Sequence, residues 1–214
     1  PIWSQNVKIL RGKHAKKIYH LNNKDKIVLS TPMYHSISFR LVVLSIVLGS
    51  TCVILKKFNV NEWFNTIKKW QITFSILVSD QIEMISSNLN TTAYKRITSL
   101  KKLVSCCSPL KQKIKEKLIK QNYFEIFDTY GASEVGTITN INLKKEIKKI
   151  KSNGKVVPEY NVKILKKLSE HKLIVQTLPS ISDIVEGKVT MLDIKELDIN
   201  DLLNREQVPP KKEL

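Results

Sequence analysis

The sequence predicts an α/β fold in which helices flank a mostly parallel sheet, with a small β-rich extension. From Lys26 onward, short runs rich in β-branched residues alternate with longer segments whose apolar residues recur at helical spacing. This alternation is typical of βαβ units around a parallel sheet. The 214 residues, 42% of them hydrophobic, suffice for one large domain or two small ones.

The first predicted strand is Lys26–Ser30, and a largely buried helix over Phe39–Leu48 follows it. Gly49 is a suitable stop for this helix, because glycine tolerates the left-handed conformation that ends many helices. The next predicted strand is Thr51–Leu55, and Asn61 is a candidate cap for the helix after it. Four apolar side chains of that helix are expected on one buried face: Trp63, Phe64, Ile67 and Trp70.

A second strand and helix follow in the same order. Ile72–Val78 is a predicted strand, and Asp80 with Glu83 forms a candidate capping box for the next helix. A polar linker over Asn88–Thr92 comes after this helix. The side chains expected to face inward from the helix are Ile82, Ile85 and Leu89.

The last βα unit leads into a glycine turn. Leu103–Cys107 is predicted as a short strand, and Pro109 is expected to open a lysine-rich helix. Phe124–Phe127 is a further strand that runs directly into the segment Asp128–Gly136. The buried stripe of the lysine-rich helix is expected to comprise Leu110, Ile114 and Leu118.

The pattern weakens beyond this turn. A basic run occupies Lys144–Lys151, and Asn161–Leu165 with Lys172–Gln176 resembles the two strands of a β-hairpin. We therefore expect three parts: residues 1–150 within a large domain of βαβ units, residues 151–182 as a β-rich subdomain, and residues 183–214 as a poorly patterned acidic tail.

The formal net charge is +17, from 36 Lys and Arg against 19 Asp and Glu. Such an excess is compatible with binding a polyanion. No RNP-type motif, helix-turn-helix pattern or interleaving of basic and aromatic residues accompanies the charge, so nucleic acid is the less favoured partner. The composition does not define an oligomeric state.

Neither a membrane span nor a secretory leader is expected. The longest apolar stretch, Leu41–Leu48, is too short to cross a bilayer, and the first residues show no signal-peptide pattern, so we expect a cytoplasmic protein. The three cysteines are too few for a disulfide framework or a zinc site, and we expect buried thiols on strands. They are Cys52, Cys106 and Cys107.

The segment Asp128–Gly136, with the sequence DTYGASEVG, groups side chains that suit a nucleotide. Glycine lets backbone approach a ligand, and Tyr130 offers a flat ring that can stack on a base. Ser133 can donate to a phosphate oxygen, and Glu134 supplies the carboxylate oxygen that Mg²⁺ prefers. Taken alone, the segment is explained equally well as a tight turn with a surface glutamate.

This segment is similar to the Tyr-Gly-x-Ser/Thr-Glu motif of the adenylate-forming (AMP-binding) superfamily of acyl-CoA synthetases and ligases. Thr31–His35 is similar to the family's Pro-Met-Phe/Tyr-His segment, and Ser105–Leu110 resembles Ser-Gly-Gly-Ala-Pro-Leu. Gly154–Ile164 resembles Gly-Lys-Pro-x-Pro-Gly-x-x-Val-Lys-Ile. The resemblance covers about Lys26–Gln176, and the shared order of segments carries more weight than any one motif.

The resemblance implies a role for each segment. Tyr130 would stack on adenine, Ser133 would contact the α-phosphate, Glu134 would hold Mg²⁺, and His35 would line the acyl pocket. For His35 the alternative is a capping histidine at a strand end. We therefore expect Ser133, Glu134 and His35 as catalytic residues. The expected nucleotide-binding residues are Cys107, Ser108, Pro109, Asp128, Thr129, Tyr130, Gly131, Ala132 and Ser133.

The function that the resemblance implies is that of an AMP-dependent synthetase or ligase. A carboxylic acid attacks the α-phosphate of ATP, pyrophosphate leaves, and the acyl-adenylate passes its acyl group to a thiol, usually that of coenzyme A. Mg²⁺ and cationic donors would neutralise charge at phosphorus. ATP, Mg²⁺ and coenzyme A are therefore the expected cofactors and co-substrates, and a carboxylic acid is the expected substrate.

The resemblance does not extend to every part of such an enzyme. The sequence shows no counterpart of the family's phosphate loop, its Tyr-x-Thr-Gly-Asp segment or its small mobile domain. Cys106 and Cys107 replace a glycine pair, and Glu159 stands where glycine is usual. We therefore expect little or no turnover from the isolated chain, whether it is a fragment or a degenerate paralogue. The alternative is a non-catalytic protein that binds a nucleotide, an acyl group or a partner.

Overall fold

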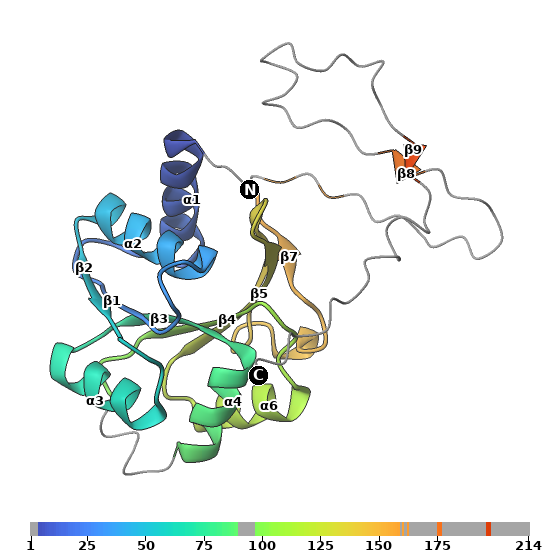
Figure 1. Ribbon diagram of the computed structural model, residues 1–214. Helices are drawn as coiled ribbons and strands as arrows, with labels where there is room; N and C mark the ends of the chain where they lie inside the picture. The colour runs from blue at the N-terminus through green and yellow to red at the C-terminus, as the bar shows by residue number, and fades with distance from the viewer. Residues whose placement is uncertain are drawn as a thin grey trace, which may run out of the picture. The chain divides into compact units, whose positions relative to one another are not determined.

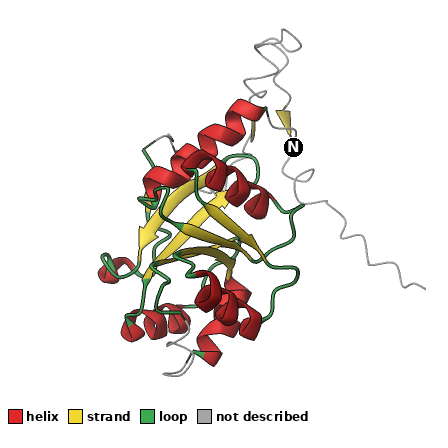
Figure 2. Cartoon of the chain, turned by 90° about the vertical axis from the view of Figure 1, so that its left-hand side faces the viewer, coloured by secondary structure: helices red, strands yellow, loops and turns green. Residues whose placement is uncertain are grey.

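The computed structural model describes residues 4–89, 97–158, 160 and 162, together with two short strands at 175–176 and 196–197. The chain divides into two compact units, Pro1–Val162 and Lys163–Leu214. The first unit is a mixed seven-stranded sheet with helices on both faces (Figures 1 and 2). The predicted α/β fold with a mostly parallel sheet is confirmed.

Five strands of this sheet run parallel in the order β2-β1-β3-β4-β5, and β6 and β7 extend it in antiparallel fashion beyond β5. The inner strands are almost wholly apolar and buried, because a parallel sheet covered on both faces needs apolar side chains on both. The strands are Lys26–Leu29 (β1), Thr51–Ile54 (β2), Phe74–Val78 (β3), Lys102–Cys106 (β4), Glu125–Ala132 (β5), Gly136–Asn142 (β6) and Lys155–Val156 (β7).

Two groups of helices cover the two faces of the sheet (Figures 1 and 2). One group is α1 (Gln5–Ile18) and α2 (Ser36–Leu48), whose cluster of buried side chains includes Tyr19, Leu41, Leu44, Phe74 and Phe127. The other group is α3 (Val60–Trp70), α4 (Ser79–Asn88) and α6 (Gln112–Gln121), with Trp63, Phe64, Ile67, Ile82 and Leu118 in its cluster. A short 3₁₀ helix, η1, occupies Ile147–Lys149 within the predicted basic run.

The start of α3 lies earlier than predicted. Asn59, and not Asn61, is the cap, because its Oδ1 accepts hydrogen bonds from the N–H groups of Asn61 (3.0 Å) and Glu62 (3.2 Å). The expected burial of Trp70 was also wrong. Its side chain is 47% exposed at the end of the helix, where the Lys69 ammonium lies 5.5 Å from the ring centre.

The start of α4 also differs from the prediction. The helix begins at Ser79, so Asp80 lies inside its first turn and does not cap it. The capping hydrogen bond at this end instead involves Gln81, whose Oε1 accepts from the N–H of Val78 at 3.4 Å. Glu83 does not take part in a capping box. Its carboxylate instead forms an ion pair with Lys111, the residue just before α6, at 2.8 Å.

Two further helices depart from the prediction in detail. The lysine-rich helix α6 begins at Gln112 and not at Pro109, since the Ser108 carbonyl accepts a hydrogen bond from Ser79 Oγ (2.5 Å) and the chain stays in a loop there. The helix α2 is less buried than expected, because Phe39 and Ile46 are 40% and 74% exposed. The strand β2 next to α2 is an outer edge of the sheet.

The second unit contains one described strand pair. Val175–Gln176 (β8) pairs in antiparallel fashion with Glu196–Leu197 (β9). The other predicted hairpin strand, 161–165, lies outside the described residues except for Val162, as do Glu159 and residues 90–92 of the predicted linker. The expected boundaries after residues 150 and 182 stay predictions. Within the described residues, no helix is long and apolar enough to cross a membrane.

A buried ion pair joins α6 to β5. Lys115 Nζ lies 2.6 Å from Asp128 Oδ2, and the two side chains are only 7% and 6% exposed. Lys115 Nζ also donates to the carbonyl oxygen of Ile150 at 3.2 Å, so the pair reaches the segment that follows β6. Removing one partner of such a pair leaves an uncompensated charge in a nonpolar environment, which is strongly destabilising.

The Asp128→Leu variant is therefore expected to lose about 3–5 kcal/mol of unfolding free energy, because the Lys115 charge stays buried without a partner. The double variant Lys115→Met with Asp128→Leu should recover most of that loss, since it buries no charge. Urea unfolding followed by circular dichroism measures both. Equal stabilities of the single and double variants would contradict a buried pair.

Candidate functional site

Three connections meet at the carboxyl ends of the parallel strands. They are residues 30–35 after β1, residues 107–111 after β4, and the turn at 133–135 between β5 and β6. The chain runs from β1 to β2 on one side and then crosses back to β3 on the other side of β1, so the strand order reverses between β1 and β3. Ligands of open α/β sheets bind at such points, outside the carboxyl ends of the strands.

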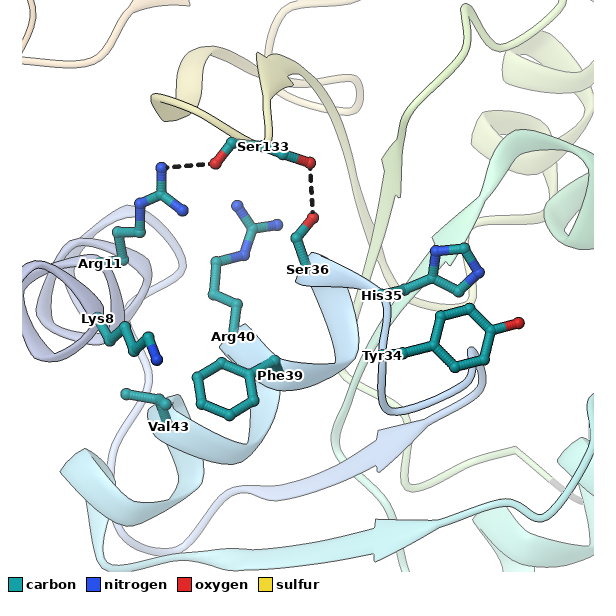
Figure 3. A pocket seen from close by; sticks show the side chains of 9 residues that line it. All are labelled: Lys8, Arg11, Tyr34, His35, Ser36, Phe39, Arg40, Val43 and Ser133. Atoms are coloured by element: carbon teal, nitrogen blue, oxygen red, sulfur yellow. Dashed lines mark hydrogen bonds between the residues drawn. The ribbon is translucent and has the colours of Figure 1, made fainter. Parts of the chain in front are cut away.

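A pocket of about 410 Å³ opens between α1, α2 and the β5–β6 turn (Figure 3). Figure 3 shows the guanidinium groups of Arg11 and Arg40 on the side toward Ser133, and the rings of Tyr34 and His35 close together on another side. The centres of these two rings are 4.6 Å apart. The residues that line the pocket are Lys8, Arg11, Tyr34, His35, Ser36, Phe39, Arg40, Val43 and Ser133.

The pocket therefore combines cationic groups with aromatic and apolar ones, and the Nζ of Lys8 lies 4.7 Å from the centre of the Phe39 ring. Its volume lies in the range of small-molecule sites, about 300–1,000 Å³. Such a lining suits a ligand with an anionic group at one end and a nonpolar body at the other.

The helix α1 holds the β5–β6 turn in place. Arg11 Nη2 donates to the carbonyl oxygens of Ser133 (2.8 Å) and Glu134 (2.7 Å). The hydroxyl oxygen of Ser133 lies 2.9 Å from that of Ser36, which begins α2. Partial burial lowers the pKa of Arg11 below its usual value, opposed by nearby Tyr160. Arg11 was not identified from the sequence, because no element was predicted before Lys26.

A second pocket, of about 80 Å³, adjoins the first and shares Arg11, Ser36, Arg40 and Ser133 with it. The structure brings five of the predicted nucleotide-binding residues together in its wall: Cys107, Thr129, Gly131, Ala132 and Ser133. In volume this second pocket lies below the usual range of small-molecule sites.

Hydrogen bonds from β5 and from the start of α4 fix the end of β4 and the loop after it. Thr129 Oγ1 of β5 donates to the carbonyl oxygen of Ser105 at 2.8 Å. On the other side, Ser79 Oγ donates to the carbonyl oxygen of Ser108. The side chains of Ser108 and Pro109 remain exposed at the same edge of the sheet. The loop is thus held by its backbone, with side chains left open toward the pocket or solvent.

The other predicted site residues lie in different surroundings. Tyr130 is 57% exposed on the hairpin, and Glu134 is exposed at its tip. Asp128 directs its carboxylate into the core, toward Lys115, and not toward either pocket. His35 occupies the position before α2, where its side chain makes no capping hydrogen bond, and it lies in the wall of the larger pocket.

Gly131 lies at an irregularity in the β5–β6 pairing, where the register shifts between Tyr130 and Gly131. A Cβ atom at position 131 would lie 1.9 Å from the carbonyl oxygen of Gly136. No side chain fits at that distance without moving the backbone. Glycine is therefore required for the hairpin to bend over the pockets.

Cys107 adopts a φ of +76°, in the left-handed region that favours glycine. The segment Ser-Gly-Gly-Ala-Pro-Leu that Ser105–Leu110 resembles has glycine at this position, and the backbone conformation here is one that favours glycine. The expectation of buried thiols on strands is met by Cys106 at the end of β4, but it was wrong for Cys107, which is exposed in the loop. The side chain of Cys107 forms part of the wall of the smaller pocket.

Glu134 is the expected Mg²⁺ ligand. Across the parts of the chain that the structure describes, no group of three or more His, Cys, Asp or Glu side chains could hold a metal ion. Proteins commonly bind Mg²⁺ through one or two carboxylates together with substrate phosphates. Glu134 is exposed at the tip of the turn, where its carboxylate is accessible.

Residues 5–175 match the model of the AMP-binding enzyme family, and the chain belongs to that family. A probable CoA ligase of Humulus lupulus is 27% identical over 143 residues, which cover 64% of this chain and 26% of the relative. The 4-coumarate–CoA ligase of Pinus taeda is 26% identical over 160 residues, covering 72% of this chain and 29% of the relative. The chain thus spans less than a third of the length of these relatives.

Solved structures of acyl-CoA synthetases share the fold. O-succinylbenzoate CoA synthetase from Bacillus subtilis, in complex with ATP and magnesium, has a TM-score of 0.65 and 16% identity, covering 75% of this chain and 33% of the other. The N-terminal domain of FACL13 from Mycobacterium tuberculosis has a TM-score of 0.62 and 15% identity, covering 70% and 37%. At such identities the likeness shows the fold alone.

The Gly131→Ala variant is expected to lose about 2 kcal/mol or more of unfolding free energy, because the added methyl group overlaps the Gly136 carbonyl. The neighbouring exposed Ala132→Ser variant is the matched control and should change stability by less than about 0.5 kcal/mol. Urea unfolding of both variants gives the comparison. Similar losses in the two would show that position 131 has no special backbone requirement.

The Cys107→Gly variant is expected to be more stable than Cys107→Ala by about 1 kcal/mol, since only glycine adopts a φ of +76° without steric cost. Both variants remove the same thiol, so the difference isolates the backbone conformation. Thermal or urea unfolding measures it. Greater stability of the alanine variant would contradict a left-handed backbone at this position.

Proposed function

We propose that this chain is the central part of the large domain of a ligase that activates a carboxylic acid as an acyl-adenylate and then as a CoA thioester. The observation that carries the proposal is the convergence of three connections on two adjoining pockets, in a chain that belongs to the AMP-binding enzyme family. Relatives described as CoA ligases, and a neighbour solved with ATP and magnesium, support it.

In this proposal the nucleotide lies along the β5–β6 hairpin and the loop after β4. Tyr130 stacks on adenine, and residues 107–109 run beside it. Ser133 contacts the α-phosphate, and Glu134 holds the Mg²⁺ that accompanies the phosphates. The exposed tyrosine ring and carboxylate, with Ser133 in the walls of both pockets, support this arrangement.

The acid lies in the larger pocket. His35 and Tyr34 flank the reacting carboxylate, and the nonpolar body of a fatty or aromatic acid contacts Phe39 and Val43. Arg11 and Arg40 supply positive charge beside Ser133, where charge develops as the carboxylate attacks the α-phosphate and pyrophosphate leaves. The thiol of coenzyme A then attacks the acyl carbonyl carbon, and AMP is the leaving group.

The isolated chain is proposed to have weak turnover or none. The smaller pocket, at about 80 Å³, leaves little room for a base in this conformation, and a cysteine side chain forms part of its wall. The alternative is a non-catalytic protein that binds a nucleotide or an acyl group, and the larger pocket of about 410 Å³ has room for an acyl group. Retained binding without pyrophosphate release would distinguish this alternative from a ligase. A cytoplasmic location stays part of the proposal.

Calorimetric titration of the chain with ATP in excess Mg²⁺ should give one binding event per chain. Glu134→Gln should weaken it about tenfold, because a charge-assisted contact contributes about 1.5–3 kcal/mol. Glu62→Gln removes an equally exposed carboxylate on α3, outside both pockets, and should leave binding unchanged. Pyrophosphate release is then measured with a panel of fatty and aromatic acids.

The outcomes separate the hypotheses. Binding that depends on Glu134, with acid-dependent pyrophosphate release, supports a working ligase domain. Binding that depends on Glu134 without pyrophosphate release supports the non-catalytic alternative. A failure to bind ATP, or equal effects of the Glu134 and Glu62 substitutions, would overturn the nucleotide assignment.

A further inference from the structure

Two adjacent thiols lie beside the smaller pocket, and one of them faces its opening. The sulfur atoms of Cys106 and Cys107 are 3.9 Å apart, within hydrogen-bonding distance for sulfur. Cys106 is only 7% exposed at the end of β4, whereas Cys107 is exposed in the loop. Both line the pocket together with Arg40 of α2 and Arg11 of α1. The pair therefore consists of one accessible thiol and one buried neighbour.

The surroundings favour the ionised form of the accessible thiol. The side-chain contact with the Cys106 thiol lowers the pKa of Cys107 to about 6, with a further contribution from the positive charge of Arg40, while burial opposes the shift. The same contact and burial raise the pKa of Cys106. The negative charge of Asp128 on β5 raises the pKa of Cys106 further. Of the two thiols, Cys107 is therefore the one whose ionisation the site favours.

We propose that Cys107 is a modification site for low-molecular-weight disulfides, activated by the neighbouring thiol of Cys106. The chemistry is thiol–disulfide exchange. The Cys107 thiolate attacks one sulfur of the disulfide, a new sulfur–sulfur bond forms, and the bond between the two reagent sulfurs breaks. The departing thiolate takes a proton from solvent. The disulfide is the oxidant, and a reducing thiol restores the free cysteine.

The third cysteine offers an internal comparison. Cys52 lies half-buried in β2, and burial raises its pKa. It therefore has less thiolate at neutral pH and is less accessible than Cys107. Since these three are the only cysteines in the sequence, a Cys52→Ser background leaves the vicinal pair alone.

Modification of Cys107 also has a consequence for the pocket. Its side chain forms part of the wall that contains Thr129 and Gly131. If the disulfide is oxidised glutathione, the glutathione tripeptide added to Cys107 would fill the space beside the β5–β6 hairpin. This consequence rests on the proposed nucleotide site, whereas the reactivity of the thiol does not. We expect the modified chain to bind ATP more weakly than the reduced chain.

The test uses oxidised glutathione and the Cys52→Ser chain. Mass spectrometry after exposure at neutral pH should show one added glutathione, located on Cys107 by peptide mapping and removed by dithiothreitol. The rate of alkylation by iodoacetamide should rise as the pH rises through about 6, because the thiolate forms there, and level off by about pH 7. A rate that continues to rise to pH 9, or glutathione on Cys106, would overturn the proposal.

Two further variants test the role of Cys106. Cys106→Ala removes the donor and should slow alkylation of Cys107 at neutral pH by about tenfold, whereas Cys106→Ser keeps an O–H donor and should restore most of the rate. Circular dichroism checks that both remain folded. Equal rates in the two variants would overturn the activating role of Cys106.

The reaction with oxidised glutathione also distinguishes a failure of this inference from a failure of the proposed function. Saturating ATP and Mg²⁺ should slow the modification of Cys107 if the nucleotide lies along the loop. Rapid modification that ATP does not slow would count against the nucleotide assignment and leave the thiol inference standing. Slow modification of Cys107 in the absence of nucleotide would overturn the thiol inference, whatever ATP does.

Discussion

Arg11 on α1 donates to two successive carbonyl oxygens in the β5–β6 turn, and the site depends on this contact. The contact closes one side of both pockets, because the turn lies over the start of α2, where Ser36 and Ser133 meet. A single nitrogen, Nη2, makes both hydrogen bonds, so the two carbonyl oxygens are held close together at one point of α1. The position of Ser133 is thus set jointly by α1, α2 and the hairpin.

The strand β5 connects this site to the rest of the molecule. Residues that alternate along a strand face opposite sides of a sheet. Asp128 accordingly pairs with Lys115 on the face covered by α6, while Thr129 donates to the carbonyl oxygen of Ser105 near the end of β4, just before the loop. Beyond Gly131 the strand leaves the layered core and bends over the pockets. One strand therefore carries an anchor in the core, a support for the neighbouring loop and the residues proposed to contact the nucleotide.

Much of this architecture was predictable, because buried strands and amphipathic helices leave a periodic pattern, as Phe74–Val78 and α3 do. The helix α1 was missed, since charged residues recur all along it, and β6 was missed because its sequence, GTITNIN, is largely polar. Contacts between distant residues were beyond sequence reasoning: Arg11 lies 122 positions before Ser133. The exposure of Cys107 depends on a left-handed backbone that the sequence does not announce.

The outer strand β2 has a practical consequence for work with this chain. Among the strands that the structure describes it pairs with β1 alone, and Ile54 in it is 55% exposed. An open edge with an accessible apolar side chain is a template on which strands of other molecules can assemble. Light scattering should therefore be used to monitor self-association of the isolated chain. Ligand binding should be measured in dilute solution.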